Sequence, residues 1–442
     1  MDVMPMNETG ERVERRRTLV ELIKETYPEK TGSLFFVSAF EQERHQFYQD
    51  STFEYFFGLQ ESALLIYQEI DGKTVLFEPN YSVDRSVWLP VNFDESDLSE
   101  LAIDAVEKLG QTIKGYSTGP FFTPEQLENF IKKIQDQLDA GHFIFTALTD
   151  IFPECAWVVN QLCVFIPGLK EQLIDIAPLI AELRRTKSQK ELEYLYHASE
   201  ITVMAQQAAA GIIRKDNLEA DVQAAIEYVF TESGATRAFA SVVGAGKNST
   251  TLHYVDNKGP LPEKGLVVVD IGASFNHYCS DVTRTYPVSG IFSERQRKVY
   301  QDVLDTQEYI AGIAKPGMFM RNKNEPDKCL NTLSKKFLAQ RGYNVEKEFP
   351  HGIGHYVGLD VHDVGSYETP IQAGDIITIE PGLYLKDEEI GIRIEDIYWV
   401  IKDGIVCLSE GVPKKPEEVQ KYMKESRFED ESDSYRAGPN EH

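Results

Sequence analysis

The 442-residue chain holds 45 lysine and arginine residues against 71 aspartate and glutamate residues, which gives a formal net charge of −26. This charge repels nucleic-acid backbones and anionic membranes, so nucleic-acid binding is disfavoured. A hydrophobic fraction of 42% with 11% aromatic residues excludes a disordered chain. Because the length exceeds the roughly 250 to 300 residues at which one hydrophobic core stops growing, two domains are expected.

The cysteines and the first residues bear on cellular location. The five cysteines are odd in number and contain no C-x-x-C pair, which suits neither a disulfide framework nor a zinc site. Residues 1–17 are charged and lack the apolar segment of a signal peptide, and no run of about 18 apolar residues follows. A cytoplasmic protein is therefore expected, neither secreted nor membrane-spanning.

Residues 1–178 alternate short apolar runs with helical stretches. Runs such as 33–37 and 63–67 are typical of strands, whereas 98–109 has helical spacing. This alternation predicts an α/β domain. The aromatic segment 53–57 is expected to be core or interface rather than a cofactor site.

A domain boundary is expected between residues 178 and 179. Beyond it, Ser188 and Glu191 have the S-x-x-E spacing of a capping box. Helical apolar spacing follows over 191–232 and again over 294–313. Three segments are predicted. Residues 1–178 form an amino-terminal α/β domain, residues 179–415 form a larger α+β domain, and residues 416–442 form an acidic tail expected to be disordered.

In the larger domain, residues 266–270 and 280–286 are typical of two buried strands joined by a short loop. If the turn is centred on residues 275–276, Asp270 lies opposite Asp281. Opposed residues on a strand pair have Cβ atoms roughly 4.5 to 5.5 Å apart, so the two carboxylates would face each other. This register is an assumption of the prediction.

The same construction recurs further along the chain. Residues 376–380 and 391–395 flank a charged stretch, and a turn centred on 387–388 sets Glu380 opposite Glu395. Facing like charges in an apolar setting are destabilising, and a bound cation reverses the sign of that interaction. Each acid taken alone would be expected at the surface, but two hairpins of the same design favour a metal site.

A histidine cluster adds a further candidate ligand. Three of the nine histidines, His351, His355 and His362, fall within twelve residues and beside glycines that allow close backbone approach. Four carboxylates and one imidazole form a hard, oxygen-rich donor set, which favours manganese over a thiolate-type zinc site. Cys279 stands alone and is not expected to be a ligand.

This pattern resembles the ligand set of the pita-bread metallopeptidases, a family that includes methionine aminopeptidase, prolidase and aminopeptidase P. The resemblance is greatest to the aminopeptidase P (Xaa-Pro aminopeptidase) group, and it covers residues 179–415 strongly and 1–178 more weakly. The ligand positions that match are Asp270, Asp281, His355, Glu380 and Glu395. The flanking motifs are Leu252-His253-Tyr254, Asp281-Val282-Thr283-Arg284-Thr285, His351-Gly352-Ile353-Gly354-His355, Val361-His362-Asp363, Glu380-Pro381-Gly382-Leu383-Tyr384 and Gly391-Ile392-Arg393-Ile394-Glu395-Asp396. The stretch between Tyr384 and Gly391 is shorter than in some relatives, which affects the expected rim of the cleft.

The resemblance implies a pita-bread catalytic domain that follows a smaller α/β domain, and two divalent metal ions, with Mn²⁺ expected. Asp281, His355 and Glu380 would bind mainly one ion, and Asp270 would bind the other through both oxygens. Asp281 and Glu395 would bridge the two ions. A pair of such cations activates a water molecule and polarises the substrate carbonyl.

The resemblance also implies roles in catalysis and substrate binding. Glu380 would carry a proton from the attacking water to the leaving nitrogen. His253 and His362 would act on the substrate as hydrogen-bond donors during catalysis. The residues expected to bind substrate are His253, His351, His362, Tyr384 and Arg393, the last of which would also orient a carboxylate.

The expected function is hydrolysis of the peptide bond before proline, with release of the amino-terminal residue. Prolidase, which cleaves Xaa-Pro dipeptides with the same ligands, is the main alternative, and methionine aminopeptidase is disfavoured because it needs no such first domain. A non-catalytic peptide-binding module and a creatine-type hydrolase are more distant alternatives, and the intact ligand set argues against both. The expected partners are a proline-containing peptide and further copies of the chain in a dimer or tetramer, without nucleic acid or membrane.

Overall fold

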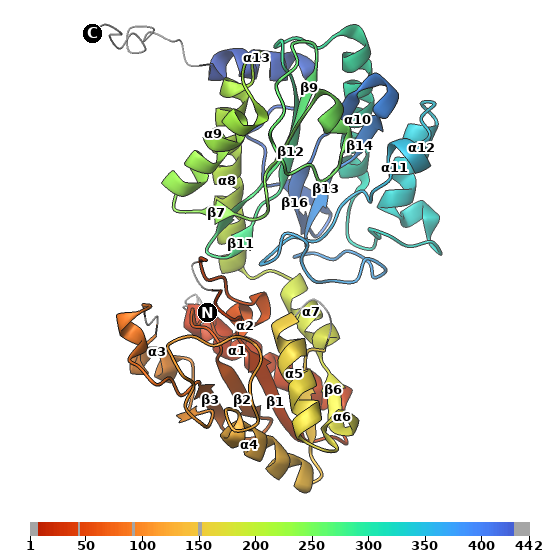
Figure 1. Cartoon of the computed structure of the whole chain (residues 1–442). Coiled ribbons are helices and arrows are strands. Elements are labelled where there is room, and N and C mark those ends of the chain that lie inside the picture. Colours follow the sequence, from red (N-terminus) through yellow and green to blue (C-terminus); the bar gives the residue numbers. More distant parts are fainter. Residues whose placement is uncertain (1–7, 43–44, 91–92, 149–152, 428–442) are drawn as a thin grey trace, which may run out of the picture. The chain divides into compact units, whose positions relative to one another are not determined.

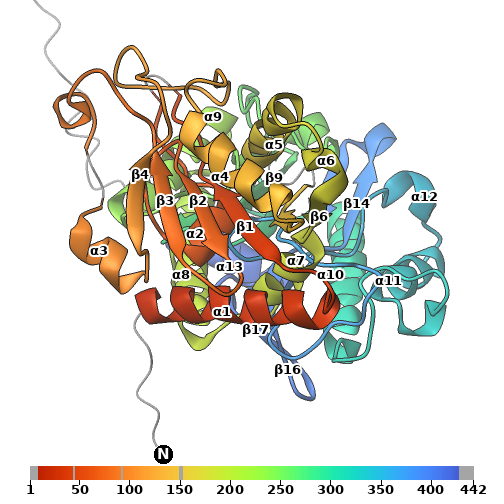
Figure 2. The ribbon, with the colours of Figure 1, turned by 90° about the horizontal axis from the view of Figure 1, so that it is seen from below.

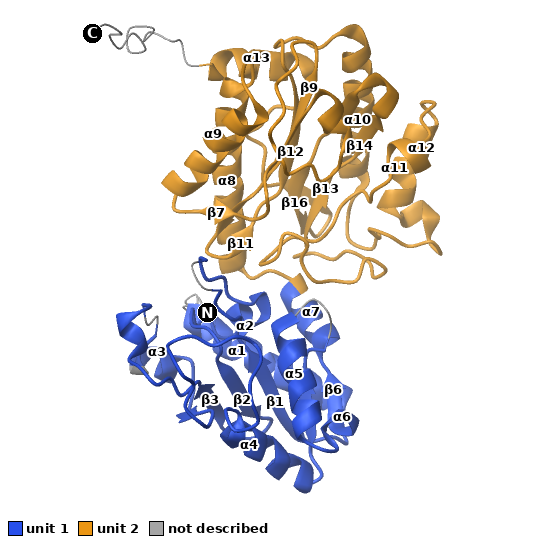
Figure 3. Ribbon diagram, viewed as in Figure 1, with its two compact units in different colours: residues 1–184 blue, residues 185–442 orange. Residues whose placement is uncertain are grey.

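The computed structural model describes residues 8–42, 45–90, 93–148 and 153–427. The chain divides into two compact units, residues 1–184 and 185–442 (Figure 3). The boundary expected from the sequence lies within helix α7 (Ala177–Arg185), at which the first unit ends. None of the helices in the described ranges combines the length and the apolar composition that crossing a membrane requires.

The first unit is built on a mixed six-stranded sheet with the order β4-β3-β2-β1-β5-β6, which confirms the predicted α/β class. Figure 2 shows strands β4, β3, β2 and β1 side by side. The strands are β1 (Gly32–Val37), β2 (Leu65–Glu69), β3 (Thr74–Glu78), β4 (Ala105–Lys108), β5 (Phe143–Thr146) and β6 (Leu173–Asp175). The helices before α7 are α1 (Glu8–Thr26), α2 (Ser51–Phe56), η1 (Arg85–Val87), α3 (Glu95–Glu100), α4 (Glu128–Asp139), α5 (Pro153–Phe165) and α6 (Leu169–Gln172).

The aromatic segment of this unit belongs to its core. The Asp50 carboxylate accepts hydrogen bonds from the first N–H groups of α2 and so fixes where that helix begins. Phe53, Phe56 and Phe57 are buried. Of the two roles expected for residues 53–57, the structure supports the core.

The helix predicted over residues 98–109 is wrong beyond its first residues. Helix α3 ends at Glu100, and Ala102 has a φ of 53°, a left-handed conformation that stops a helix. Residues 105–108 instead form the edge strand β4, parallel to β3. Backbone pairing along the sheet outweighs the helical spacing of the sequence here.

In its described residues, the second unit has four antiparallel sheets, with the strand orders β12-β9-β8, β11-β10-β7, β13-β16-β17 and β14-β15. Figure 1 shows α8 and α9 on one side of these strands and α10 on the other. The strands are β7 (Thr236–Arg237), β8 (Val242–Ala245), β9 (Leu266–Ile271), β10 (Ala273–Phe275), β11 (Tyr278–Cys279), β12 (Val282–Pro287), β13 (Ile376–Ile379), β14 (Gly382–Leu385), β15 (Ile390–Arg393), β16 (Asp396–Ile401) and β17 (Gly404–Cys407). The helices are α8 (Gln189–Ile212), α9 (Glu219–Glu232), η2 (Gly246–Thr250), α10 (Glu294–Ile313), η3 (Pro326–Lys328), α11 (Leu330–Ala339), α12 (Val345–Glu348), η4 (Lys386–Glu388) and α13 (Pro416–Ser426).

Helix starts in this unit follow the sequence signals. The predicted capping box of Ser188 and Glu191 is present at the start of α8, and α10 spans the predicted residues 294–313. The helical run over 191–232 is divided into two helices, because Asp216 has a φ of 76° between α8 and α9.

The tail expected to be disordered is in part folded. Residues 416–426 form helix α13, in which Val419 and Met423 are buried in the core of the second unit. Those two apolar residues, four apart on one face, outweigh the acidic composition. The part of the predicted tail at 428–442 lies outside the described residues.

The first hairpin has a different register from the one predicted. Asn276 and His277 both have positive φ, 46° and 70°, and form a two-residue turn of the kind that matches strand twist. The turn is therefore centred between these residues, and Asp270 pairs with Thr283 instead of Asp281. The prediction of directly opposed carboxylates is wrong, although the two positions still share a face of the strand pair.

The second hairpin has the predicted register. Strands β14 and β15 pair Gly382 with Arg393 and Leu385 with Ile390. Strands β13 and β16 pair in the same register as β14 and β15. Glu380 and Glu395 therefore lie opposite each other, between these two pairs of strands.

A glycine in β15 lets that strand approach η2. The Gly391 N–H donates to Ser249 Oγ at 2.9 Å, and a Cβ at this position would lie 1.9 Å from the Ser249 carbonyl oxygen. Any side chain would therefore separate the strand that leads to Glu395 from its neighbour.

We predict that Gly391→Ala lowers the midpoint of thermal unfolding, since overpacking of this kind costs about 1–3 kcal/mol. Gly404→Ala is the matched control, because a Cβ at position 404 meets no atom within 4 Å. Differential scanning calorimetry of both variants is the measurement. Equal midpoints for the two variants would contradict the packing argument.

Candidate metal centre

Five strand ends and loops of the second unit converge on one place. Asp270 lies near the end of β9, and Asp281 lies just before β12. His355 comes from the loop that precedes β13, Glu380 directly follows β13, and Glu395 lies between β15 and β16. The predicted ligands therefore come from separate elements that the strand pairing brings together.

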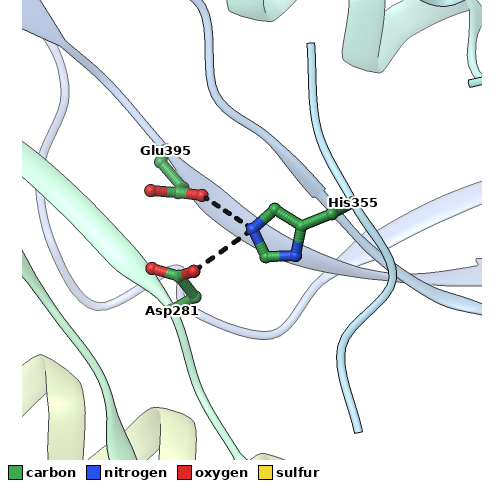
Figure 4. Close-up of side chains that lie close together, drawn as sticks. All are labelled: Asp281, His355 and Glu395. Carbon is green, nitrogen blue, oxygen red and sulfur yellow. Dashed lines mark ion pairs between the residues drawn. The ribbon is translucent and has the colours of Figure 1, made fainter. Parts of the chain in front are cut away.

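The imidazole of His355 lies among the carboxylates. Its Nε2 atom is 3.3 Å from Asp281 Oδ2, 3.7 Å from Glu380 Oε1 and 4.0 Å from Glu395 Oε1. Figure 4 shows that Asp281 and Glu395 each direct one carboxylate oxygen at the same nitrogen of this ring. One potential ligand atom from each of Asp281, His355 and Glu395 lies within 4.8 Å of the others, a spacing that fits a bound metal ion.

The loop that carries His355 is held so that Nε2 faces the carboxylates. His355 Nδ1 is 3.0 Å from the Tyr356 carbonyl oxygen, to which it donates, so the lone pair is left on Nε2. Gly354 lets this loop lie on β13, because a Cβ there would be 2.1 Å from the Thr378 carbonyl oxygen. Two hydrogen bonds between the backbone of His355 and Thr378 fix the contact.

The buried acids repel one another. Burial raises the pKa values of Asp281 and Glu380, and the nearby carboxylates raise both further. Burial, with the Asp270 carboxylate, raises the pKa of Glu395 to about 7. Positive charge in this place would favour the ionised form of all four acids.

Two carboxylate oxygens lack partners. Asp270 Oδ1 and Asp281 Oδ1 are buried and have no hydrogen-bond partner among the described residues. Such atoms are costly unless an ion or water satisfies them. Together with the oxygen-rich donor set, they fit a centre for divalent cations. Cys279 does not join the donor set, because its buried thiol contacts the Leu359 carbonyl oxygen at 3.4 Å and burial raises its pKa.

Arg393 and Thr283 orient the carboxylates. Arg393 Nη2 donates to Asp270 Oδ2 at 2.5 Å, and its Nε donates to Thr283 Oγ1 at 3.1 Å. The Thr283 hydroxyl in turn donates to Glu395 Oε2 at 2.7 Å. These contacts fit the predicted role of Arg393 in orienting a carboxylate. Thr283 was not singled out from the sequence, although its place two residues after Asp281 on the same strand face is a signal that could have found it.

A hydrogen-bonded chain leads from Arg393 to His351. Arg393 Nη1 donates to the Tyr384 hydroxyl at 2.7 Å, and that hydroxyl lies 2.9 Å from His351 Nε2. His351 Nδ1 is 2.8 Å from the Gly352 carbonyl oxygen, so Nε2 accepts from Tyr384. Burial, with the charge of Arg393, lowers the pKa of His351 to about 3, and the ring is neutral.

All ten residues singled out from the sequence line one cavity of about 980 Å³. They are Asp270, Asp281, His355, Glu380, Glu395, His253, His351, His362, Tyr384 and Arg393. The His362 ring stacks on His355 with centroids 4.0 Å apart. Burial and the neighbouring His355 lower the pKa of His362 to about 4, so it too is neutral at physiological pH. Arg321, Lys347, Tyr367 and Lys386 also line the cavity and were not predicted.

The chain is similar in sequence to known peptidases. Residues 193–402 match the model of metallopeptidase family M24. The chain is 29% identical to the Xaa-Pro aminopeptidase of Haemophilus influenzae, over 82% of this chain and 93% of that protein. It is 36% identical to the Xaa-Pro dipeptidase of Pyrococcus horikoshii, over 54% of this chain and 68% of that protein.

The fold agrees as well. The solved structure of zinc-substituted Escherichia coli aminopeptidase P in complex with product has a TM-score of 0.77 and 26% identity, and the match covers 96% of this chain and 100% of that one. The predicted pita-bread domain with an amino-terminal α/β domain is thereby confirmed. The chain belongs to metallopeptidase family M24 and has the fold of aminopeptidase P.

Proposed function

We propose that this protein is a metal-dependent hydrolase that releases the amino-terminal residue from peptides whose second residue is proline. The observation that carries the proposal is the cluster of Asp281, Glu380 and Glu395 around His355, in which all three carboxylates have raised pKa values. Asp270 Oδ1 and Asp281 Oδ1 are also buried without a hydrogen-bond partner among the described residues. A cluster of this kind is destabilising without cations. The similarity to Xaa-Pro aminopeptidases supplies the reaction.

Asp270, Asp281, His355, Glu380 and Glu395 would hold two divalent cations. When bound, the cations lower the pKa of water and polarise the scissile carbonyl. The oxygen-rich donor set favours Mn²⁺. Manganese, a cytoplasmic location and assembly into a dimer or tetramer stay predictions.

Glu380 is the proposed proton carrier. It is less buried than Asp281 and Glu395, and its Oε2 atom lies 3.5 Å from His351 Nδ1 on the cavity wall. Its raised pKa, which burial and Glu395 cause, suits a group that accepts a proton from water and returns it to the proline nitrogen.

His253 and His362 are the proposed donors to the substrate. Both line the cavity, and His362 lies in van der Waals contact with the metal-facing ring of His355. A neutral imidazole in this position can donate one hydrogen bond to a carbonyl or to the tetrahedral intermediate.

His351 and Tyr384 are proposed to border the proline ring. Proline has no N–H and fixes its own backbone angle, so recognition depends on shape and on the preceding carbonyl. The hydrogen bonds from Arg393 through Tyr384 to His351 hold both rings in place. They form a rigid wall at this side of the cavity.

Prolidase activity is the second candidate, because Xaa-Pro dipeptidases are among the relatives. The cavity volume of about 980 Å³ lies at the upper end of ordinary ligand sites, which favours a substrate longer than a dipeptide.

We predict that the manganese-loaded protein releases the first residue of an Xaa-Pro-Xaa tripeptide faster than it cleaves an Xaa-Pro dipeptide. Mass spectrometry of the products, with chelated protein as the control, is the measurement. Cleavage of the dipeptide alone would assign the protein as a prolidase instead.

Glu380→Gln is expected to lower kcat by at least roughly 100-fold, because the amide cannot carry the proton. The variant keeps the side-chain shape, and circular dichroism checks its fold. Glu417→Gln, at the exposed start of α13, is the control. Wild-type turnover in a folded Glu380→Gln protein would rule out the assigned role.

His362→Ala is expected to lower kcat by roughly 100-fold, the usual cost of losing one such donor, while the bound metal per chain stays unchanged. Elemental analysis supplies the second readout. The exposed His197, replaced by alanine, is the control. Parallel loss of metal and turnover would make His362 a ligand or a structural residue.

Metal affinity is expected to rise with pH. Because burial raises the pKa of Glu395 to about 7, the metal-free centre binds a proton below that pH, and a cation must displace it. Each displaced proton weakens binding about tenfold per pH unit below the pKa. Chelator competition at about pH 6 and about pH 8 measures this effect. Equal affinities at both values would contradict the raised pKa.

A further inference from the structure

The cavity has two regions of opposite charge. The acidic residues that line it are the four carboxylates of the metal centre, whose charges two divalent cations would balance. Arg393 is paired with Asp270. The remaining basic side chains in the lining are Arg321, Lys347 and Lys386, and no further acid among the described residues lines the cavity. In a chain with a net charge of −26, the outer part of this cavity is therefore positive.

Arg321 is held with its guanidinium at the cavity wall. Its backbone N–H donates to the Tyr367 carbonyl oxygen at 3.0 Å, and its guanidinium carbon lies 4.8 Å from the centre of the Tyr367 ring. The other side of the group lies against Gly352, where a Cβ would be 2.7 Å from Nη2. The ring and the glycine backbone restrict the side chain before any ligand binds.

The donors of Arg321 have no acidic partner in the described part of the chain. The more buried arginines of the same unit each bind a carboxylate: Arg185 binds Asp375, Arg284 binds Asp396 and Arg393 binds Asp270. Arg321 is exposed, and the described residues supply no ion pair to it or to Lys347 and Lys386. A positioned guanidinium with unused donors matches a carboxylate in a two-point contact.

We propose that Arg321 binds a carboxylate of the substrate on the C-terminal side of the scissile bond. The inference rests on the proposed function, in which His351 borders the proline ring. Because Arg321 lies against Gly352, the residue after His351, the chain that continues beyond proline reaches its guanidinium. Lys347 and Lys386 also line the cavity and add positive potential there.

The proposal names a substrate class. The carboxylate is the free C-terminus of a short peptide or an acidic side chain after proline. The overall negative charge of the protein repels such peptides, and the positive part of the cavity offsets that repulsion at the site. Arg321 is thus a specificity-determining residue and takes no part in bond breaking.

The test compares matched substrates in wild type and variants. Ala-Pro-Ala is paired with its C-terminal amide, and Ala-Pro-Asp amide with Ala-Pro-Asn amide, so the two pairs separate a terminal from a side-chain carboxylate. Arg321→Gln removes the positive charge and the paired guanidinium donors. Arg321→Lys keeps the charge but loses the paired donors. Arg297→Gln is the control, since Arg297 is exposed and pairs with Glu417 away from the cavity.

We expect wild type to prefer the carboxylate member of at least one pair by about tenfold in kcat/KM, the lower end for a charge-assisted hydrogen bond. Arg321→Gln abolishes the preference, so that the two members of each pair are hydrolysed with the same kcat/KM. Arg321→Lys retains part of it, and Arg297→Gln retains all of it. Equal rates within both pairs in wild type overturn the proposal, and so does a preference that Arg321→Gln keeps or that Arg297→Gln also removes.

Calorimetry separates this proposal from the proposed function. Binding of Pro-Ala and of Pro-Ala amide to the manganese-loaded protein needs no turnover. If wild type hydrolyses no Xaa-Pro peptide, the proposed function fails. The role of Arg321 is still supported if wild type binds Pro-Ala more tightly than its amide and Arg321→Gln binds the two equally. If wild type binds Pro-Ala and its amide equally, and also binds Pro-Asp amide and Pro-Asn amide equally, that role is overturned.

Discussion

Mutual repulsion among four buried carboxylates is the constraint on which the rest of the catalytic unit depends. Asp270, Asp281 and Glu395 are almost fully buried, and Arg393 is the nearest fixed positive charge. One guanidinium does not balance four acids, and two carboxylate oxygens have no hydrogen-bond partner within the described ranges. Divalent cations supply the missing charge, so the folded unit and its chemistry share one requirement.

The surrounding structure holds these acids in fixed positions against their repulsion. Strand pairing sets the separation of the carboxylates, and the Thr283 hydroxyl connects Glu395 to Arg393. Glycines at positions 354 and 391 bring loops and strands closer than any side chain permits. The same arginine extends the network through Tyr384 to His351, so the metal centre and the proposed proline wall are positioned by one set of hydrogen bonds.

Sequence reasoning predicted the site well where local signals are symmetric or strong. The register of the second hairpin follows from centring its charged turn, and α10 begins at a capping box and ends as expected. The first hairpin was misplaced because Asn276 and His277 both adopt positive φ, which moves the centre of the turn. The helix predicted over 98–109 is wrong for a similar reason. Ala102 adopts a left-handed conformation and residues 105–108 pair at the edge of the sheet, and composition shows neither backbone preference.

Side chains that reach the cavity from distant segments could not be predicted from the sequence. No local sequence pattern distinguishes Arg321. Its position depends on Tyr367 and Gly352, which lie beside it only in the folded chain. Residue spacing identifies ligands that share a motif, whereas the charge of the outer cavity arises from three separate segments.

A crystal structure of the manganese-soaked protein, with anomalous diffraction data collected at the manganese absorption edge, tests whether the carboxylate cluster holds two divalent cations. We expect two anomalous peaks among Asp270, Asp281, His355, Glu380 and Glu395, with Asp270 Oδ1 and Asp281 Oδ1 as ligands. An ordered site without anomalous density, or manganese bound elsewhere in the cavity, would contradict it.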